Sequence, residues 1–216
     1  MKTDLIFILD RSGSMSGLEA DTIGGFNSML AKQKKEEGEA TVTTVFFDHE
    51  YEIIHDRFKI EQVKPLTDDD YYVRGSTALL DAVGSTINKE INVQKRLPEG
   101  DRADKVICVI ITDGMENASR EYSYNDVSKM IQREKDKHGW EFIFLGANID
   151  AAAEAARMGI SSSRAATFCN DSAGTALNYD CVCEAVSMMR CDAMPQEDTS
   201  WKARIDRDFK RRGKRS

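Results

Sequence analysis

The sequence predicts a doubly wound, Rossmann-like α/β domain: a mostly parallel sheet with one antiparallel edge strand and helices on both faces. Two wholly apolar segments, residues 5–9 and 106–111, have the character of strands buried on both faces of a sheet. Amphipathic helical patterns alternate with these segments and with several β-branched ones. That alternation is typical of parallel strands joined by crossover helices.

The first helix is expected over residues 18–35, where Ile23, Phe26 and Leu30 recur at helical spacing. Gly24 and Gly25 interrupt this helix at a cost of about 1 kcal/mol each relative to alanine, which indicates close packing against the sheet. Residues 40–47 and 51–58 are rich in β-branched and aromatic side chains and should form a hairpin. Further helices are expected at 78–93, 123–138, 151–158 and 172–189, and further strands at 105–112, 141–145 and 164–169. Right-handed crossovers would then place the strands at 5–9 and 105–112 side by side.

Size and charge indicate one domain with a separate tail. The chain has 216 residues, of which 41% are apolar, enough for a single core over residues 1–195. Its net charge of −7 argues against general affinity for nucleic acid. Residues 202–216 nevertheless carry eight basic and two acidic side chains. We therefore expect residues 196–216 to be a basic, flexible C-terminal tail.

The cysteine pattern and the N-terminal sequence indicate a cytoplasmic protein. The five cysteines are an odd number, and four of them lie between residues 169 and 191, which is not a disulfide framework. Asp4 and Asp10 interrupt the first apolar run, so it does not resemble a signal peptide. No segment is long enough to cross a membrane, and no membrane association is expected. The sequence does not indicate an oligomeric state.

Oxygen-bearing side chains occur where three of the predicted loops meet the edge of the sheet. Asp10, Ser12 and Ser14 follow the first buried strand, Thr77 precedes a helix, and Asp113 ends the second buried strand. The carboxyl ends of neighbouring parallel strands form the usual ligand-binding edge of such sheets. Carboxylate and hydroxyl oxygens suit Mg²⁺, Mn²⁺ or Ca²⁺. For the segment D-x-S-x-S alone, helix capping is an equally good interpretation.

Together, these three segments resemble the von Willebrand factor A domain, also called the integrin I-domain type, in a stand-alone, bacterial-like form. That family carries a metal-ion-dependent adhesion site (MIDAS) made from D-x-S-x-S, a distant threonine and a distant aspartate. Asp10, Ser12, Ser14, Thr77 and Asp113 match all five positions, and the resemblance spans residues 3–190. It implies a bound Mg²⁺, or Mn²⁺ or Ca²⁺, and a protein partner that supplies an aspartate or glutamate to the metal. It also implies a non-catalytic interaction module.

Other residues in the same loops are candidates for the rim of that site, where exposed aromatic and arginine side chains often anchor partners. They are Arg11, Met15, Tyr71, Tyr72, Arg74, Met115, Glu116 and Asn117. For each of them ordinary loop solvation is the alternative.

Two other functions fit parts of the sequence. A metal-dependent hydrolase or phosphatase could use the same site, and Glu116 is then the one general base that the loops offer. A nucleic-acid-binding tail would show steeply salt-dependent binding, lost on truncation after Ser200.

Overall fold

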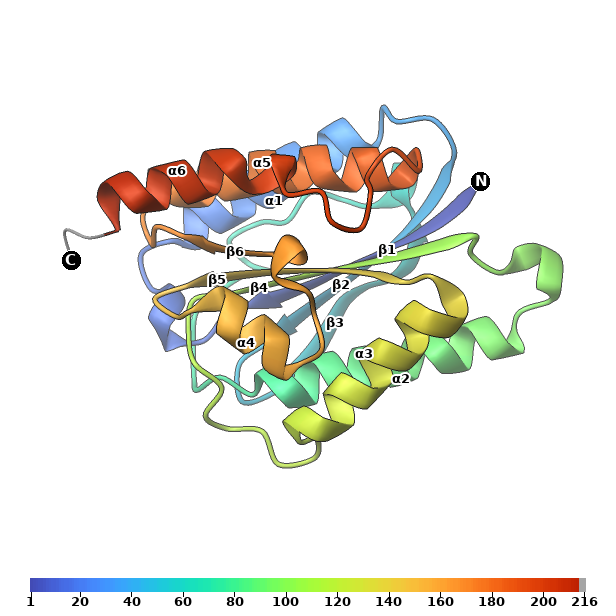
Figure 1. Cartoon of the computed structure of the whole chain (residues 1–216), viewed down its shortest axis with the longest axis horizontal. Helices are drawn as coiled ribbons and strands as arrows, with labels where there is room; N and C mark the ends of the chain where they lie inside the picture. Colours follow the sequence, from blue (N-terminus) through green and yellow to red (C-terminus); the bar gives the residue numbers. More distant parts are fainter. Residues whose placement is uncertain (214–216) are drawn as a thin grey trace.

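A computed structural model describes residues 1–213 and has one six-stranded sheet at its centre (Figure 1). The strand order is β3-β2-β1-β4-β5-β6, and only β3 runs antiparallel to its neighbour. The predicted fold class is therefore confirmed. The strands are β1 (Lys2–Asp10), β2 (Glu39–Phe47), β3 (Tyr51–Lys59), β4 (Lys105–Thr112), β5 (Glu141–Ala147) and β6 (Ala165–Phe168).

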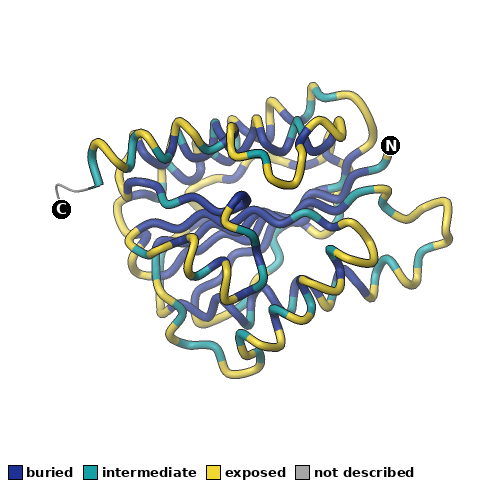
Figure 2. The backbone as a smooth tube through the Cα atoms, viewed as in Figure 1, coloured by how far each residue is buried: buried dark blue, intermediate teal, exposed yellow. Residues whose placement is uncertain are grey.

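Helices cover both faces of the sheet. On one face lie α1 (Glu19–Gln33), α5 (Ser172–Arg190) and α6 (Ala203–Arg212), and on the other α2 (Leu79–Arg96), α3 (Tyr124–His138) and α4 (Ala151–Arg157) (Figure 1). Alternate residues of β1 divide between these faces: Leu5 and Phe7 belong to the core under α1 and α5, whereas Ile6 and Ile8 belong to the core under α2 and α3. Figure 2 shows the buried sheet between helices whose outer surfaces are exposed. Within residues 1–213, no helix is both long and apolar enough to cross a membrane.

At the centre of the sheet, between β1 and β4, the order in which strands are added changes from one side of the sheet to the other. β1 pairs with β2 on one side and with β4 on the other, both in parallel. The register sets Leu9 opposite Ile111, so the loops after β1 and β4 leave the sheet side by side. The prediction that these two strands are neighbours is confirmed, and their carboxyl ends lie at the edge where such sheets usually bind ligands.

Local sequence explains where two of the helices begin and pack. Ser123 and Asp126 form a capping box at the start of α3, in which each side chain accepts a hydrogen bond from the other's backbone N–H. In α1, a Cβ on Gly25 would lie 2.3 Å from the ring of Tyr179, so glycine is required where α1 meets α5. The expected close packing is therefore found at Gly25, but against α5 rather than against the sheet, and a Cβ on Gly24 would meet open space.

The C-terminal segment differs from the flexible tail that was expected. Residues 200–202 form a single turn, η5 (Ser200–Lys202), and α6 follows it against β6 and α5. The side chains of Trp201 and Ile205 are buried, and Trp201 Nε1 donates to the carbonyl of Ser163 at 2.9 Å. The prediction of a tail relied on the net charge and overlooked an apolar stripe at helical spacing. The stripe packs the helix against the domain and consists of Trp201, Ile205 and Phe209. The last part of the predicted tail, 214–216, lies outside the described residues.

Candidate metal centre

The structure brings all five predicted site residues together at the carboxyl edge of β1 and β4. Thr77 Oγ1 donates to Ser12 Oγ at 3.0 Å, and the hydroxyl oxygens of Ser12 and Ser14 are 3.1 Å apart. Ser14 in turn donates to Asp113 Oδ1. Asp10 Oδ1 accepts a hydrogen bond from the backbone N–H of Ser12 at 2.7 Å. Three loops from different parts of the chain thus contribute to one continuous set of oxygen atoms.

This oxygen cluster has a buried floor and an open mouth. Asp10, Ser12, Thr77 and Asp113 are each no more than 3% exposed, whereas Ser14 lies on the surface. A ligand could therefore approach from solvent past Ser14 and meet side chains that are already held in place.

The two carboxylates at the site lack a cationic partner. Burial raises the pKa of Asp10, and burial together with the nearby charge of Asp10 raises the pKa of Asp113 to about 6. Among residues 1–213, no lysine, arginine or histidine forms an ion pair with either carboxylate. Two buried, like-charged groups without compensation are costly. A divalent cation would supply the missing charge.

Two glycines shape the space around the hydroxyl groups. A Cβ on Gly114 would lie 3.0 Å from Thr77 Oγ1 and 3.1 Å from Ser14 Oγ, so glycine leaves room beside the oxygen cluster. Gly75 has a φ of +73°, and a Cβ there would lie 2.1 Å from His49 Nδ1. The chain can therefore make the left-handed turn that delivers Thr77 to the site.

The donor set fits a hard cation. The described part of the chain has no cluster of three or more histidine, cysteine, aspartate or glutamate residues that could hold a metal. The site instead combines two carboxylates with three hydroxyls, all oxygen donors of the kind that Mg²⁺, Mn²⁺ and Ca²⁺ prefer. The residues present therefore fit such an ion.

Two supporting residues were missed by the sequence reasoning. Thr112 Oγ1 donates to Asp10 Oδ2 at 2.6 Å, and Asn170 Nδ2 donates to Asp113 Oδ2 at 3.2 Å. Thr112 is adjacent to Asp113 in sequence, so the motif itself pointed to it. Asn170 follows the edge strand β6, more than fifty residues away, and only the sheet order brings it close.

Glu116 and Asn117 connect the metal-site loops to each other. Asn117 Oδ1 accepts from the backbone N–H of Thr77 at 3.0 Å. The carboxylate of Glu116 accepts from the backbone N–H groups of Leu80 at 3.0 Å and Ser119 at 2.8 Å. Glu116 thus satisfies a free N–H group at the start of α2, that of Leu80, as well as one in its own loop. The Glu116 carboxylate, the candidate general base of the hydrolase interpretation, is thus held by hydrogen bonds from the surrounding backbone.

Three of the predicted rim residues are buried instead. Arg11, Met15 and Tyr71 are each at most 2% exposed. The guanidinium of Arg11 turns toward the β2–β3 hairpin, where its Nε lies 2.9 Å from Asp48 Oδ2. Tyr71 donates its hydroxyl to the carbonyl of Asp10 at 2.5 Å and thereby supports the end of β1.

Two apolar rim residues are exposed as expected. Met115 is 67% exposed and Tyr72 46% exposed, and they are among the few large hydrophobic side chains on the surface of residues 1–213. Arg74 packs over the ring of Tyr72, with its guanidinium carbon 5.6 Å from the ring centre. The site therefore has an aromatic and an aliphatic contact surface beside it.

Comparisons with known proteins identify the fold. No protein-family model and no curated protein matches the sequence. Among solved structures, the vWF domain of the pilus tip protein Mfa5 from Porphyromonas gingivalis has a TM-score of 0.58 and 12% identity, over 87% of this chain and 95% of that one. The von Willebrand factor type A protein from Catenulispora acidiphila has a TM-score of 0.56 and 14% identity, over 87% and 43%.

A third similar structure is that of proximal thread matrix protein 1 from the mussel byssus. It has a TM-score of 0.57 and 15% identity, over 88% of this chain and 46% of that one. A second structure of the mussel protein, described as having a zinc-occupied MIDAS motif, has a TM-score of 0.56. This chain spans less than half the length of the mussel and Catenulispora chains. The shared architecture shows that this chain has the von Willebrand factor A fold.

Proposed function

We propose that this domain holds a divalent cation, Mg²⁺ or alternatively Mn²⁺ or Ca²⁺, and uses it to bind a carboxylate of a partner protein. The ligands would be Asp10, Ser12, Ser14, Thr77 and Asp113. The proposal rests chiefly on one observation: Asp10 and Asp113 are buried within one hydrogen-bonded cluster, and no cationic side chain of residues 1–213 is paired to them. When bound, the cation supplies an electrophilic centre that an aspartate or glutamate of the partner can occupy.

The surroundings of the site support a protein partner. Ser14 is exposed at the mouth, and Tyr72 and Met115 lie in loops of the same edge. Tyrosine and methionine are enriched at protein interfaces, whereas a metal ion alone contributes little shape specificity. A carboxylate on the metal and apolar contacts beside it would together select one partner segment.

We infer that the domain is not an enzyme. A hydrolase at this site needs a general base within reach of the metal. Glu116 was the one candidate, and its carboxylate already accepts hydrogen bonds from Leu80, Ala118 and Ser119. A binding role needs no such base.

We also place the protein in the cytoplasm. All five cysteines are free, and four of them are buried. Free thiols persist in a reducing compartment, where disulfides are rare.

Calorimetric titration of chelator-stripped protein tests the metal site. We expect saturable one-to-one binding of at least one of Mg²⁺, Mn²⁺ and Ca²⁺, lost in Asp10→Asn, which keeps the shape of the side chain. Asp69→Asn, in an exposed loop, is the matched control and should bind as the wild type does. Equal affinity in wild type and Asp10→Asn would rule out this metal centre.

Peptide display tests the carboxylate partner separately. Random peptides would be captured in Mg²⁺ and eluted with chelator, after removal of those that bind Asp10→Asn. We expect the enriched peptides to share an aspartate or glutamate whose change to asparagine or glutamine abolishes binding. Enriched peptides without an essential carboxylate would refute this part of the proposal while leaving the metal site standing.

A further inference from the structure

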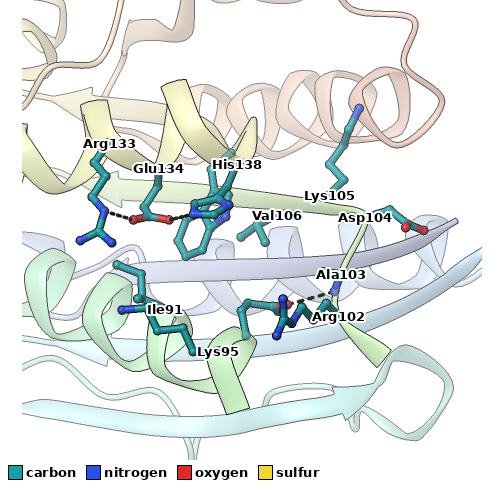
Figure 3. A pocket seen from close by; sticks show the side chains of 12 residues that line it. Ile91, Lys95, Arg102, Ala103, Asp104, Lys105, Val106, Arg133, Glu134 and His138 are labelled. Atoms are coloured by element: carbon teal, nitrogen blue, oxygen red, sulfur yellow. Dashed lines mark hydrogen bonds and ion pairs between the residues drawn. The ribbon is translucent and has the colours of Figure 1, made fainter. Parts of the chain in front are cut away.

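A second pocket lies at the opposite edge of the sheet, far from the metal centre. It has a volume of about 220 Å³ and is formed by α2, α3 and the start of β4. Figure 3 shows Arg133, Glu134 and His138 reaching into it from α3 and Ile91 and Lys95 from α2. β4 connects the two sites, since Val106 lines this pocket and Asp113 follows the other end of the strand.

The pocket contains a buried acceptor without a donor. Glu134 is 2% exposed, and its Oε1 forms no hydrogen bond within the described part of the chain. Arg133 and His138 form long ion pairs with this carboxylate, with Arg133 Nε 3.5 Å from Oε1 and His138 Nε2 3.8 Å from Oε2, but neither donates a hydrogen bond to Oε1 (Figure 3). A buried carboxylate in this state favours a ligand that brings N–H or O–H groups.

The wall beside Glu134 is apolar and partly aromatic. Trp140, Ile91 and Val106 line the pocket and are each at most 9% exposed. An indole ring next to aliphatic side chains suits a flat ring that packs by stacking or edge contact. Pockets for small molecules commonly combine such a wall with a few polar groups that fix the ligand's orientation.

The rim of the pocket is mainly basic, with Asp104 as an exposed acidic residue on it. Lys95 and Arg102 lie at its opening, and neither forms an ion pair with an acidic side chain of residues 1–213. Within the described part of the chain, the guanidinium of Arg102 donates one hydrogen bond, to the carbonyl of Leu97 at 3.2 Å. Lys105 points away from the pocket, toward the carbonyl of Met189 (Figure 3). Two unpaired cations beside an apolar wall favour an anionic group on the ligand.

We propose that this pocket binds a nucleoside phosphate. The base would pack against Trp140, its N–H or the ribose O–H groups would donate to Glu134, and the phosphate would lie between Lys95 and Arg102. The pocket is smaller than the roughly 300–1,000 Å³ of sites that enclose a whole drug-sized ligand. It therefore accommodates one ring system and leaves the phosphate at the rim, where the cations are.

Calorimetric titration with AMP and with GMP, in chelator, tests this proposal on the full chain. We expect saturable binding of at least one nucleotide, weakened about tenfold or more in Glu134→Gln and in Arg102→Ala, because each change removes a charged hydrogen-bonding partner. Arg96→Ala is the matched control, since Arg96 is an exposed cation at the same end of α2 and does not line the pocket. Circular dichroism shows whether each variant is folded.

Further titrations distinguish nucleotide binding in this pocket from simple anion binding and from binding at the metal centre. Inorganic phosphate, adenosine and guanosine should each bind at least tenfold more weakly than the nucleotide. Equal affinity for phosphate and nucleotide would overturn the proposal, as would no saturable binding of AMP or GMP up to millimolar concentration. Asp10→Asn should bind the nucleotide as wild type does, so the two proposals can fail independently.

Discussion

Two pairs of buried carboxylates lie at opposite edges of the same sheet, and they differ in whether a cationic side chain contacts them. Asp10 and Asp113, at the carboxyl edge, are each 1% exposed and have hydroxyl and amide neighbours. Asp4 and Glu90, near the amino edge, are 4% and 2% exposed, and Arg57 contacts both of them. A pair of buried carboxylates therefore occurs once with a cationic side chain of the protein beside it and once without one.

The surroundings of the amino-edge pair show what a satisfied pair requires. Besides Arg57, Gln94 donates to Glu90 Oε1 at 2.7 Å, and Thr41 donates to Asp4 Oδ1 at 2.5 Å. These groups come from β2, β3 and α2, so the pair joins elements of the fold. A pair completed by the protein is structural, whereas a pair left incomplete at a surface opening is ready for an external cation.

The largest effect should come from removing the internal cation. Arg57→Met leaves Asp4 and Glu90 without compensation, and we expect the free energy of unfolding to fall by about 3 kcal/mol at neutral pH. Urea denaturation followed by circular dichroism measures this change. Lys59→Met, an exposed change in the same strand, should have little effect. A loss of stability in Arg57→Met no larger than in Lys59→Met would show that the two pairs do not differ as described.

A bound metal ion should stabilise the protein through the carboxyl-edge pair, Asp10 and Asp113, and not through the amino-edge pair. Mg²⁺ at a hundred times its Kd should raise the free energy of unfolding by about 2.7 kcal/mol, since an ion that binds only the folded state stabilises it. Asp113→Asn should abolish this gain, and its metal-free form should be more stable than metal-free wild type because the repulsion is gone. Arg57→Met should retain the full gain. Urea denaturation of each protein with and without Mg²⁺ measures the gain. A gain in Asp113→Asn as large as that in the wild type would contradict the prediction.

The amino-edge pair should make stability depend on pH. Burial, together with the charge of Asp4, raises the pKa of Glu90 to about 7, although Gln94 donates a hydrogen bond to it. In the unfolded chain that pKa is near 4.5. The folded state thus binds the proton more tightly, so the stability that Glu90 contributes is lost as the pH rises from about 4.5 to about 7.

Glu90→Gln should flatten this dependence by about 2 kcal/mol between pH 5 and pH 8, because the titrating group is gone. Urea midpoints of both proteins across that range provide the test. A slope in Glu90→Gln as steep as that of the wild type would assign the titration to another group.

The smallest effect should come from the groups that orient the metal-site carboxylates. Thr112→Val keeps the shape of the side chain and removes the hydroxyl that donates to Asp10, and we expect about tenfold weaker Mg²⁺ binding with the fold intact. Asn170→Ala should weaken binding less, because its hydrogen bond to Asp113 is longer, at 3.2 Å. Thr86→Val, a buried threonine on α2, is the control. Unchanged Mg²⁺ affinity in Thr112→Val would deny this residue a positioning role.

The carboxyl-edge site was predictable because its residues are tied to strand ends. Asp10 and Asp113 each follow a continuous apolar run, and parallel strands deliver such positions to one edge. The amino-edge pair has no such signature. Glu90 lies in a polar stretch of α2 that resembles a solvent-facing helix surface, and Arg57 lies on an edge strand. Only the packing of α2 across the sheet makes them neighbours.

The docking of α6 shows a different limit. Trp201, Ile205 and Phe209 were visible in the sequence at helical spacing, but the dense basic charge around them favoured a solvated tail. Long charged side chains on the outer face of a helix do not prevent its apolar face from packing. Periodicity was the better guide here than net charge.

The hydrogen bonds of Glu116 and Asn117 affect how fast an ion can enter the metal site. They fasten the start of α2 and the backbone of Thr77 to the loop that carries Asp113 before any ion arrives. Little of the chain then has to become ordered on binding, and the main barrier is the removal of water from the ion itself. Because Mg²⁺ gives up its water reluctantly, Ca²⁺ should enter this preformed site faster than Mg²⁺, whichever ion binds more tightly at equilibrium.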